Sequence, residues 1–201
     1  VLKVIGMEEE RFGQALDTFR SVSPDRPELG YAFLRQGKIQ EDLSNFPDAK
    51  RLYLSALAQY RRVGDELGAG ASSSALGRIA VQEGRMDDAV SLLTEALPVV
   101  RRSRNTDEMS SLLANLAAAR RVRGDLAGAA DAYKEALAIR LGVSDPRGAA
   151  AVSMNLGAIL EEMGELVGAG TAFRQSRETL AALGDTAAVR QADEAILRIK
   201  A

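Results

Sequence analysis

Two asparagines with equivalent spacing are the side chains best suited to bind another molecule. Asn115 and Asn155 lie 40 residues apart in the chain. An amide group both donates and accepts hydrogen bonds, so two amides in line could hold the backbone of an extended peptide. The plainer interpretation is that both amides are solvated polar groups on the surfaces of helices.

Charged side chains form a second candidate for recognition. Arg35, Lys38 and Arg78 belong to the early part of the chain, and Glu161 and Glu162 to the late part. On one common surface they would make its early half basic and its late half acidic, so that an acidic peptide segment would fit the early half. The plainer interpretation is again solvation, since charged residues normally cover the exposed faces of helices.

Six arginines form another basic group, which could bind phosphate or nucleic acid. No aromatic residues that could stack on bases are interleaved with them, and the chain has a net charge of −2. The alternative is that these cations stabilise the C-termini of helices through the helix dipole. We therefore expect no nucleic-acid partner. The six are Arg101, Arg102, Arg104, Arg120, Arg121 and Arg123.

Residues typical of catalytic and metal sites are scarce. The sequence has no cysteine and no histidine, which removes thiolate nucleophiles, the commonest general base and the usual zinc ligands. Phosphate-binding loops and nucleophile elbows are also missing. The adjacent acidic pairs Asp87–Asp88 and Glu161–Glu162 would not face each other on a helix. We therefore expect no enzymatic activity, no cofactor and no metal.

The composition favours a helical chain without a membrane segment. Hydrophobic residues make up 46% of the 201 residues and aromatic residues only 4%. Alanine, leucine and glycine are abundant, and such side chains suit closely packed helices better than a sheet. No apolar run reaches the roughly 18 residues of a membrane span, and no signal peptide is recognisable. We expect a cytoplasmic protein without membrane contact.

Residues of the same type recur every 40 positions, which predicts a repeated structural unit. One column carries Asp or Asn, which suits helix N-caps. Another carries glycine, which suits a turn after a helix C-terminus. Between them, each unit has room for two antiparallel helices of about 18 residues. The columns are Asp25, Asp65, Asn105, Asp145 and Asp185; Gly37, Gly77, Ala117 and Gly157; Ser44, Gly84, Gly124 and Gly164; Ala49, Ala89, Ala129 and Ala169; and Tyr53, Leu93, Tyr133 and Phe173.

Apolar stripes and small residues indicate how the helices pack. Val152, Leu156, Ile159 and Met163 have the spacing of one buried helix face. A glycine in the middle of a helix costs about 1 kcal/mol relative to alanine. The recurrence of glycine at positions such as Gly157 therefore predicts a close approach between the two helices of a hairpin.

These columns resemble the tetratricopeptide repeat family. The resemblance covers about residues 25 to 185, and the first unit departs from it at Gln36 and Ser44. The period of 40 is similar to that of the long-helix members found in regulatory and scaffolding proteins. The resemblance implies an all-α solenoid of antiparallel helix hairpins that forms a right-handed superhelix with a concave groove. In similar long-repeat proteins, asparagines placed like Asn115 and Asn155 contact bound peptides.

We expect one array over residues 1–201, with about 4.5 repeats. Residues 6–23 would be an N-terminal half repeat, residues 25–64, 65–104, 105–144 and 145–184 the repeats, and residues 185–201 a C-terminal capping helix. The half repeat would leave Phe12, Phe19 and Val22 partly uncovered, which could drive the formation of a homodimer through the terminal helices. The half repeat and the start at Val1 instead of methionine favour an excerpt of a longer protein.

The expected function is that of a scaffold that binds a peptide or helix of another protein in the groove. The alternative is a sensor or oligomerisation module from a larger bacterial transcriptional or signalling regulator. Reversing the charges of Arg35 and Arg78 to glutamate is expected to weaken partner capture without unfolding the protein. The predicted groove residues are Tyr31, Arg35, Lys38, Arg78, Gln82, Asn115, Asn155 and Glu162.

Overall fold

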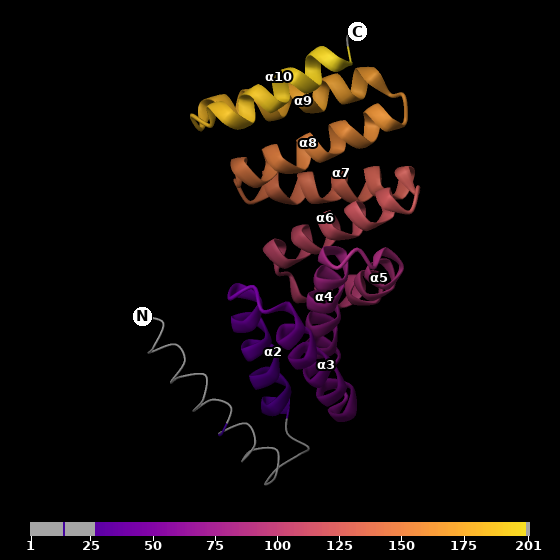
Figure 1. Ribbon diagram of the computed structural model, residues 1–201, viewed down its shortest axis with the longest axis vertical. Coiled ribbons are helices and arrows are strands. Elements are labelled where there is room, and N and C mark those ends of the chain that lie inside the picture. The colour runs from indigo at the N-terminus through magenta and orange to yellow at the C-terminus, as the bar shows by residue number, and fades with distance from the viewer. Residues whose placement is uncertain (1–13, 15–26, 200–201) are drawn as a thin grey trace.

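The computed structural model describes residue 14 and residues 27–199 (Figure 1). These residues form nine helices and no strand, which confirms the predicted all-α class. The predicted half repeat, with Phe12, Phe19 and Val22, and the first cap, Asp25, lie outside the described residues. The helices are α2 (Pro27–Asp42), α3 (Phe46–Val63), α4 (Glu66–Gln82), α5 (Met86–Ser103), α6 (Thr106–Val122), α7 (Leu126–Gly142), α8 (Pro146–Glu162), α9 (Leu166–Ala182) and α10 (Thr186–Arg198).

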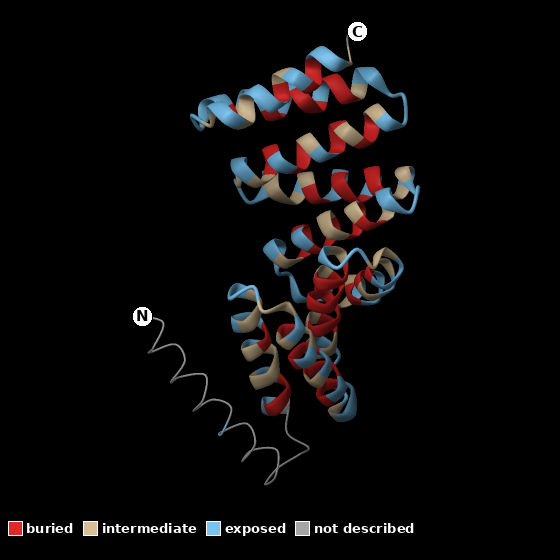
Figure 2. Ribbon diagram, in the orientation of Figure 1, coloured by how far each residue is buried: buried red, intermediate tan, exposed pale blue. Residues whose placement is uncertain are grey.

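The helices stack in chain order as antiparallel hairpins. Each helix packs on its neighbours in the sequence, and α4 also contacts α2 and α6. Figure 1 shows that the direction of the helices turns along the stack: α2 and α3 run along its long axis, whereas α7 to α10 run across it. The predicted solenoid of helix hairpins is therefore confirmed. Buried residues follow the interior of the stack, and exposed residues gather at the turns (Figure 2).

Side-chain caps begin α4, α6, α8 and α10, as the sequence predicts. The carboxylate of Asp65 accepts a hydrogen bond from the backbone N–H of Gly68, and Asn105, Asp145 and Asp185 cap α6, α8 and α10 in the same way. These side chains satisfy a backbone donor that would have no partner within the helix.

The turns between helices use a left-handed residue at one recurring position. Gly84, Gly124 and Gly164 all have positive φ, which confirms the predicted turn glycines. Ser44, Arg104 and Ser144 occupy equivalent turns with φ of 61°, 57° and 55°. For a residue with a Cβ atom this conformation costs about 1–2 kcal/mol.

Replacing Ser44, Arg104 and Ser144 together with glycine is expected to stabilise the array. The gain should be about 1–3 kcal/mol in total, because the relief of backbone strain exceeds the larger entropy that glycine loses on folding. Urea denaturation followed by circular dichroism measures it as a higher midpoint. The converse change Gly84→Ser should lower the midpoint, and a triple variant no more stable than the parent would contradict the prediction.

The two helices of each hairpin approach closely where glycine or alanine faces a large buried side chain. A Cβ atom added to Gly157 would lie 2.5 Å from Cε1 of Phe173, and one added to Gly77 would lie 2.6 Å from Cγ of Leu93. The predicted close approach is therefore confirmed. Met163 departs from the predicted buried stripe: it follows Glu162, the last residue of α8, and is 37% exposed.

Candidate partner-binding groove

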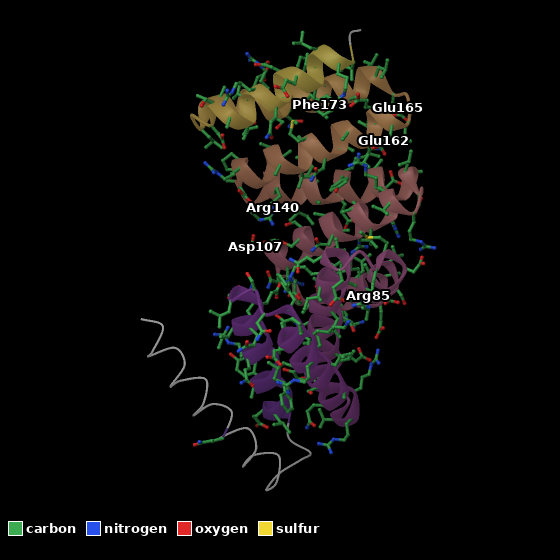
Figure 3. All side chains as sticks on the ribbon, viewed as in Figure 1. Arg85, Asp107, Arg140, Glu162, Glu165 and Phe173 are labelled. Atoms are coloured by element: carbon green, nitrogen blue, oxygen red, sulfur yellow. The ribbon has the colours of Figure 1, made fainter. Side chains whose placement is uncertain are left out.

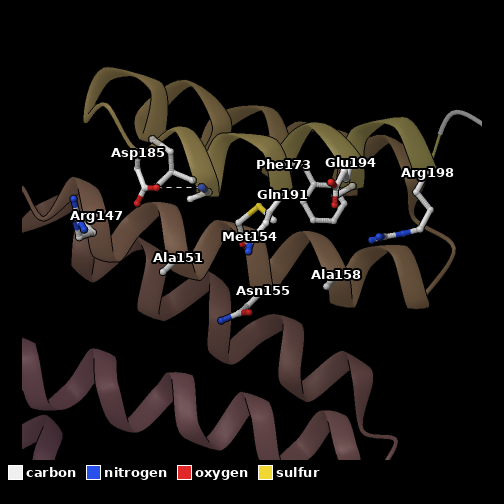
Figure 4. Close-up of a pocket in the computed structure, with 13 residues that line it drawn as sticks. Arg147, Ala151, Met154, Asn155, Ala158, Phe173, Asp185, Gln191, Glu194 and Arg198 are labelled. Atoms are coloured by element: carbon white, nitrogen blue, oxygen red, sulfur yellow. Dashed lines mark hydrogen bonds between the residues drawn. The ribbon is translucent and has the colours of Figure 1, made fainter.

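The first helices of the hairpins share one face, on which two clefts open. The first, which we call the α2–α6 cleft, has a volume of about 490 Å³ and lies between α2, α4 and α6. The second, which we call the α8–α10 cleft, has a volume of about 610 Å³ and lies between α8, α9 and α10 (Figure 4). Together these clefts are the groove considered below.

Five of the eight predicted groove residues line these clefts. Arg35, Lys38, Arg78 and Asn115 line the α2–α6 cleft. Asn155 lines the α8–α10 cleft, beside Met154 on the same helix (Figure 4). The structure therefore brings four of the predicted side chains together and places the fifth in the neighbouring cleft.

The other three predicted residues lie on the surface and line neither of the two clefts. Tyr31 is 59% exposed on the second turn of α2. Gln82 and Glu162 are the exposed last residues of α4 and α8.

A hydrogen-bonded ion pair lies beneath the α2–α6 cleft. Arg78 on α4 donates from Nε to Oε1 of Glu41 on α2 at 2.6 Å and from Nη2 to Oε2 at 2.5 Å. The hydroxyl of Tyr53 donates to the same carboxylate at 2.7 Å. The side chain of Glu41 is only 8% exposed and that of Arg78 31%. Burial opposes the ionisation of Glu41, but the hydrogen bonds from Arg78 and Tyr53 outweigh it, and the pKa of the carboxyl falls below its usual value.

This ion pair corrects the predicted role of Arg78. Its guanidinium is already bound bidentately to Glu41, so Arg78 is not a free cation awaiting an acidic partner. Arg78→Glu would set two carboxylates against each other below the protein surface. In contrast to the expectation from the sequence, we therefore expect this reversal to destabilise the fold.

The predicted charge gradient along the groove is also wrong, because ion pairs neutralise it. Lys38 contacts Asp42 at 2.8 Å. At the late end, Glu161 accepts from Nε of Arg198 at 2.6 Å, and Glu162 pairs with Arg121. Arg35 differs from these residues, since it is exposed and makes no ion pair within the described part of the chain.

A partly buried glutamate on α6 faces the cleft from its other side. Glu108 lines the α2–α6 cleft and makes no ion pair among residues 27–199. Asn105 Nδ2 donates weakly to it at 3.4 Å. Burial raises the pKa of the Glu108 carboxyl, and the charge of Arg78 offsets only part of this effect. Its neighbour Asp107 is exposed and contacts Arg140 at 3.0 Å (Figure 3).

Sequence reasoning missed Glu41 and Glu108, although one signal for Glu41 was present. Glu41 precedes Arg78 by 37 residues, and Glu161 precedes Arg198 by the same interval. The same ion pair is thus repeated between neighbouring first helices. Glu108 carried no such signal, because its lack of a partner follows only from the packing of three helices.

The amide groups of Asn115 and Asn155 are free to bind a guest. Asn115 is partly buried and Asn155 is exposed. Within the described residues, neither side chain hydrogen-bonds to another protein group. Each amide therefore retains its donors and its acceptor.

The family of the central part of the chain follows from a sequence comparison. Residues 68–142 match the family model described as tetratricopeptide repeat. This segment is therefore similar to tetratricopeptide repeats. The matched segment begins in α4 and ends with α7, so it includes Arg78, Glu108 and Asn115 of the α2–α6 cleft.

Solved structures similar to this one extend the same fold over most of the chain. BtubC from P. vanneervenii is 18% identical, with a TM-score of 0.67, and the match covers 96% of this chain and 89% of that one. A kinesin light chain candidate from Podospora anserina with nearly identical TPR-like repeats is 15% identical, with a TM-score of 0.64 over 88% and 97% of the two chains. Aspartyl phosphate phosphatase F from Bacillus subtilis is 14% identical, with a TM-score of 0.71.

The length of one of these proteins differs from that of this chain. The match to aspartyl phosphate phosphatase F covers 94% of this chain but 52% of that protein, so the chain spans about half its length. None of the curated proteins matches the sequence significantly.

Five of the six arginines of the second basic group form ion pairs within the described part of the chain. Arg101 contacts Glu135 at 2.6 Å and Arg123 contacts Asp87 at 2.8 Å, both between helices. Arg104 forms a left-handed turn. Since carboxylates already occupy most of these cations, the group has the properties of structural ion pairs. The remaining pairs are Arg102 with Glu66, Arg120 with Asp125, and Arg121 with Glu162.

No three acidic side chains in the described part of the chain gather as metal ligands would. None of the helices from α2 to α10 has both the length and the apolar character needed to cross a bilayer.

Proposed function

We propose that the array is a scaffold that binds a segment of another protein in the groove of its first helices. The observation that carries this proposal is the pair of free amides, Asn115 and Asn155, which occupy equivalent positions on α6 and α8 and line separate clefts. An extended peptide backbone offers a donor and an acceptor at every residue, so it could bond to both amides at once.

The side chains around the two amides are small enough for the main chain of a bound peptide to come close to them. Ala118 and Ala158 follow the two asparagines by three residues, which places them one helical turn further along the same face. Ala151 is exposed one turn before Asn155. Small side chains at these positions leave room for a main chain beside the amides.

Replacing Asn115 and Asn155 together with alanine is expected to weaken peptide binding by about tenfold or more. Each lost hydrogen bond is worth about 0.5–1.5 kcal/mol. Segments selected from a display library of random peptides on the parent array would provide the ligands. Fluorescence anisotropy would then compare the dissociation constants of the parent and the variant.

The control is Gln175→Ala, which removes an exposed amide from the second helix α9, away from both clefts. It should leave binding unchanged, and both variants should retain the melting temperature of the parent. Equal affinity of the double variant and the parent would rule out the asparagines as the binding groups. A library that yields no binder to the parent would rule out the groove.

A second candidate is that the array is a sensor or oligomerisation module of a larger regulator. The observation in its favour is the match to aspartyl phosphate phosphatase F, of which the matched part makes up 52%, so that a fold of this kind is joined there to a further part of the protein. The complete reading frame tests it. An adjoining DNA-binding or catalytic domain would support this candidate, and a reading frame that encodes the array alone would contradict it.

A further inference from the structure

We propose that the α2–α6 cleft selects a segment that carries one basic and one acidic side chain, the basic one bound at Glu108 and the acidic one at Arg35. This inference rests on the proposed function, because it names the kind of guest that the groove prefers. It rests on the ion pairs of the charged residues that line the cleft or lie beneath it, because two of these residues have no ion-pair partner among the described residues.

The charges of the cleft are satisfied within the protein, with two exceptions. Arg78 is held by Glu41, Lys38 contacts Asp42, and Asp107 contacts Arg140. Glu108 and Arg35 make no ion pair with these residues, with each other or with the rest of the described chain. Among the described residues, the cleft therefore presents one negative charge without an ion-pair partner on α6 and one such positive charge on α2.

Glu108 and Arg35 lie on different helices of the same cleft, and apolar side chains line the cleft beside them. Leu34 on α2, Ala71 and Ala75 on α4, and Leu112 on α6 line the cleft together with them. A guest that covers these apolar residues removes water from the charges beside them, which strengthens each ion pair that it forms. A guest with only one sign of charge would instead bury the other residue without a partner, which is costly.

Glu108 also has a structural explanation, which the experiment must separate from this one. Asn105 caps α6 by accepting from the backbone N–H of Glu108, and its amide donates weakly to the glutamate side chain. Glutamine at position 108 could keep this capping geometry. A purely structural role therefore predicts that Glu108→Gln leaves the choice of guest unchanged.

The experiment selects random segments of about 12 residues, displayed between two folded carriers so that neither terminus is free. Selections use the parent array, Glu108→Gln and Arg35→Gln. The matched controls Glu178→Gln on α9 and Arg190→Gln on α10 remove exposed charges that line neither cleft.

Segments selected by the parent are expected to be enriched in one basic and one acidic residue at a constant spacing. Glu108→Gln should abolish the basic enrichment and weaken the parent's best segments by about tenfold, and Arg35→Gln should abolish the acidic enrichment. Without a guest, Glu108→Gln should melt at a higher temperature than the parent, because burial raises the pKa of this carboxyl and disfavours its charge.

Two different results would overturn these ideas. Binders without a preference for a charged pair, or with the same preference in Glu108→Gln, would overturn the selectivity of the cleft while leaving the groove as a binding site. A parent array that enriches no segment would overturn the groove itself, and the selectivity with it.

Discussion

Arg78→Ala is expected to lower the free energy of unfolding by about 2–4 kcal/mol. Removing one partner of a buried ion pair leaves the other charge without compensation, which costs about 3–5 kcal/mol when both are fully buried. Glu41 is nearly buried, and the 31% exposure of Arg78 reduces the expected loss. Guanidinium denaturation at neutral pH measures the change.

The chain contains a matched control for this prediction. Arg198 and Glu161 form the equivalent pair between α8 and α10, but their side chains are 60% and 21% exposed. Arg198→Ala should therefore change the stability much less than Arg78→Ala does, as is usual for exposed ion pairs. The double change Glu41→Leu with Arg78→Met should recover most of the stability lost in Arg78→Ala. If Arg78→Ala and Arg198→Ala both lowered the free energy of unfolding by the same small amount, burial of the Arg78–Glu41 pair would not explain its contribution.

The pH dependence of stability provides a second test of the prediction for Arg78→Ala. The pKa of Glu41 is lowered in the folded protein relative to its usual value of 4.5. Stability from this carboxylate is present above the pKa of the unfolded chain and is lost as the pH falls through the lower folded value. The difference in stability between the parent and Arg78→Ala should therefore shrink in acid.

Gly157→Leu is expected to destabilise the array by about 1–3 kcal/mol or more through overpacking. Even a Cβ atom at this position would lie 2.5 Å from the ring of Phe173, which is fully buried between α8 and its neighbours. A leucine cannot turn away from the ring, because α8 and α9 are paired along this face. The midpoint of urea denaturation should fall.

Two further variants separate overpacking from other causes. Gly157→Ala should cost less than Gly157→Leu, because its single added Cβ atom needs a smaller shift of the Phe173 ring and because Ala117 occupies the equivalent place opposite Tyr133. Gly157→Leu combined with Phe173→Ala should regain part of the lost stability by restoring the volume. If leucine at position 157 left the midpoint unchanged, the close approach of α8 and α9 would be refuted.

Much of the fold could be predicted because its determinants are local and repeated. Caps such as Asp65 and turn glycines such as Gly84 act within a few residues of the chain, so their spacing alone places the helix ends. Met163 shows the limit of this reasoning, since the apolar spacing in the sequence continues for one residue beyond Glu162, where α8 ends.

The candidate site was less predictable because it depends on which charges meet across helices. The sequence marks Arg35 and Arg78 as equally basic, yet only Arg78 reaches a carboxylate on the neighbouring helix. That difference follows from the way α4 packs against α2, which the pattern of residues within either helix does not show. For the same reason, Glu108 could be recognised as an uncompensated charge only after its neighbours had been placed.

The stacking of each helix on its neighbours has a mechanical consequence. Among the described helices, few contacts join hairpins that are distant in the sequence, so α2 and α10 do not hold each other in place. Small rotations at successive junctions therefore add up along the stack. We expect the separation of α2 and α10 to change at little cost to any single interface.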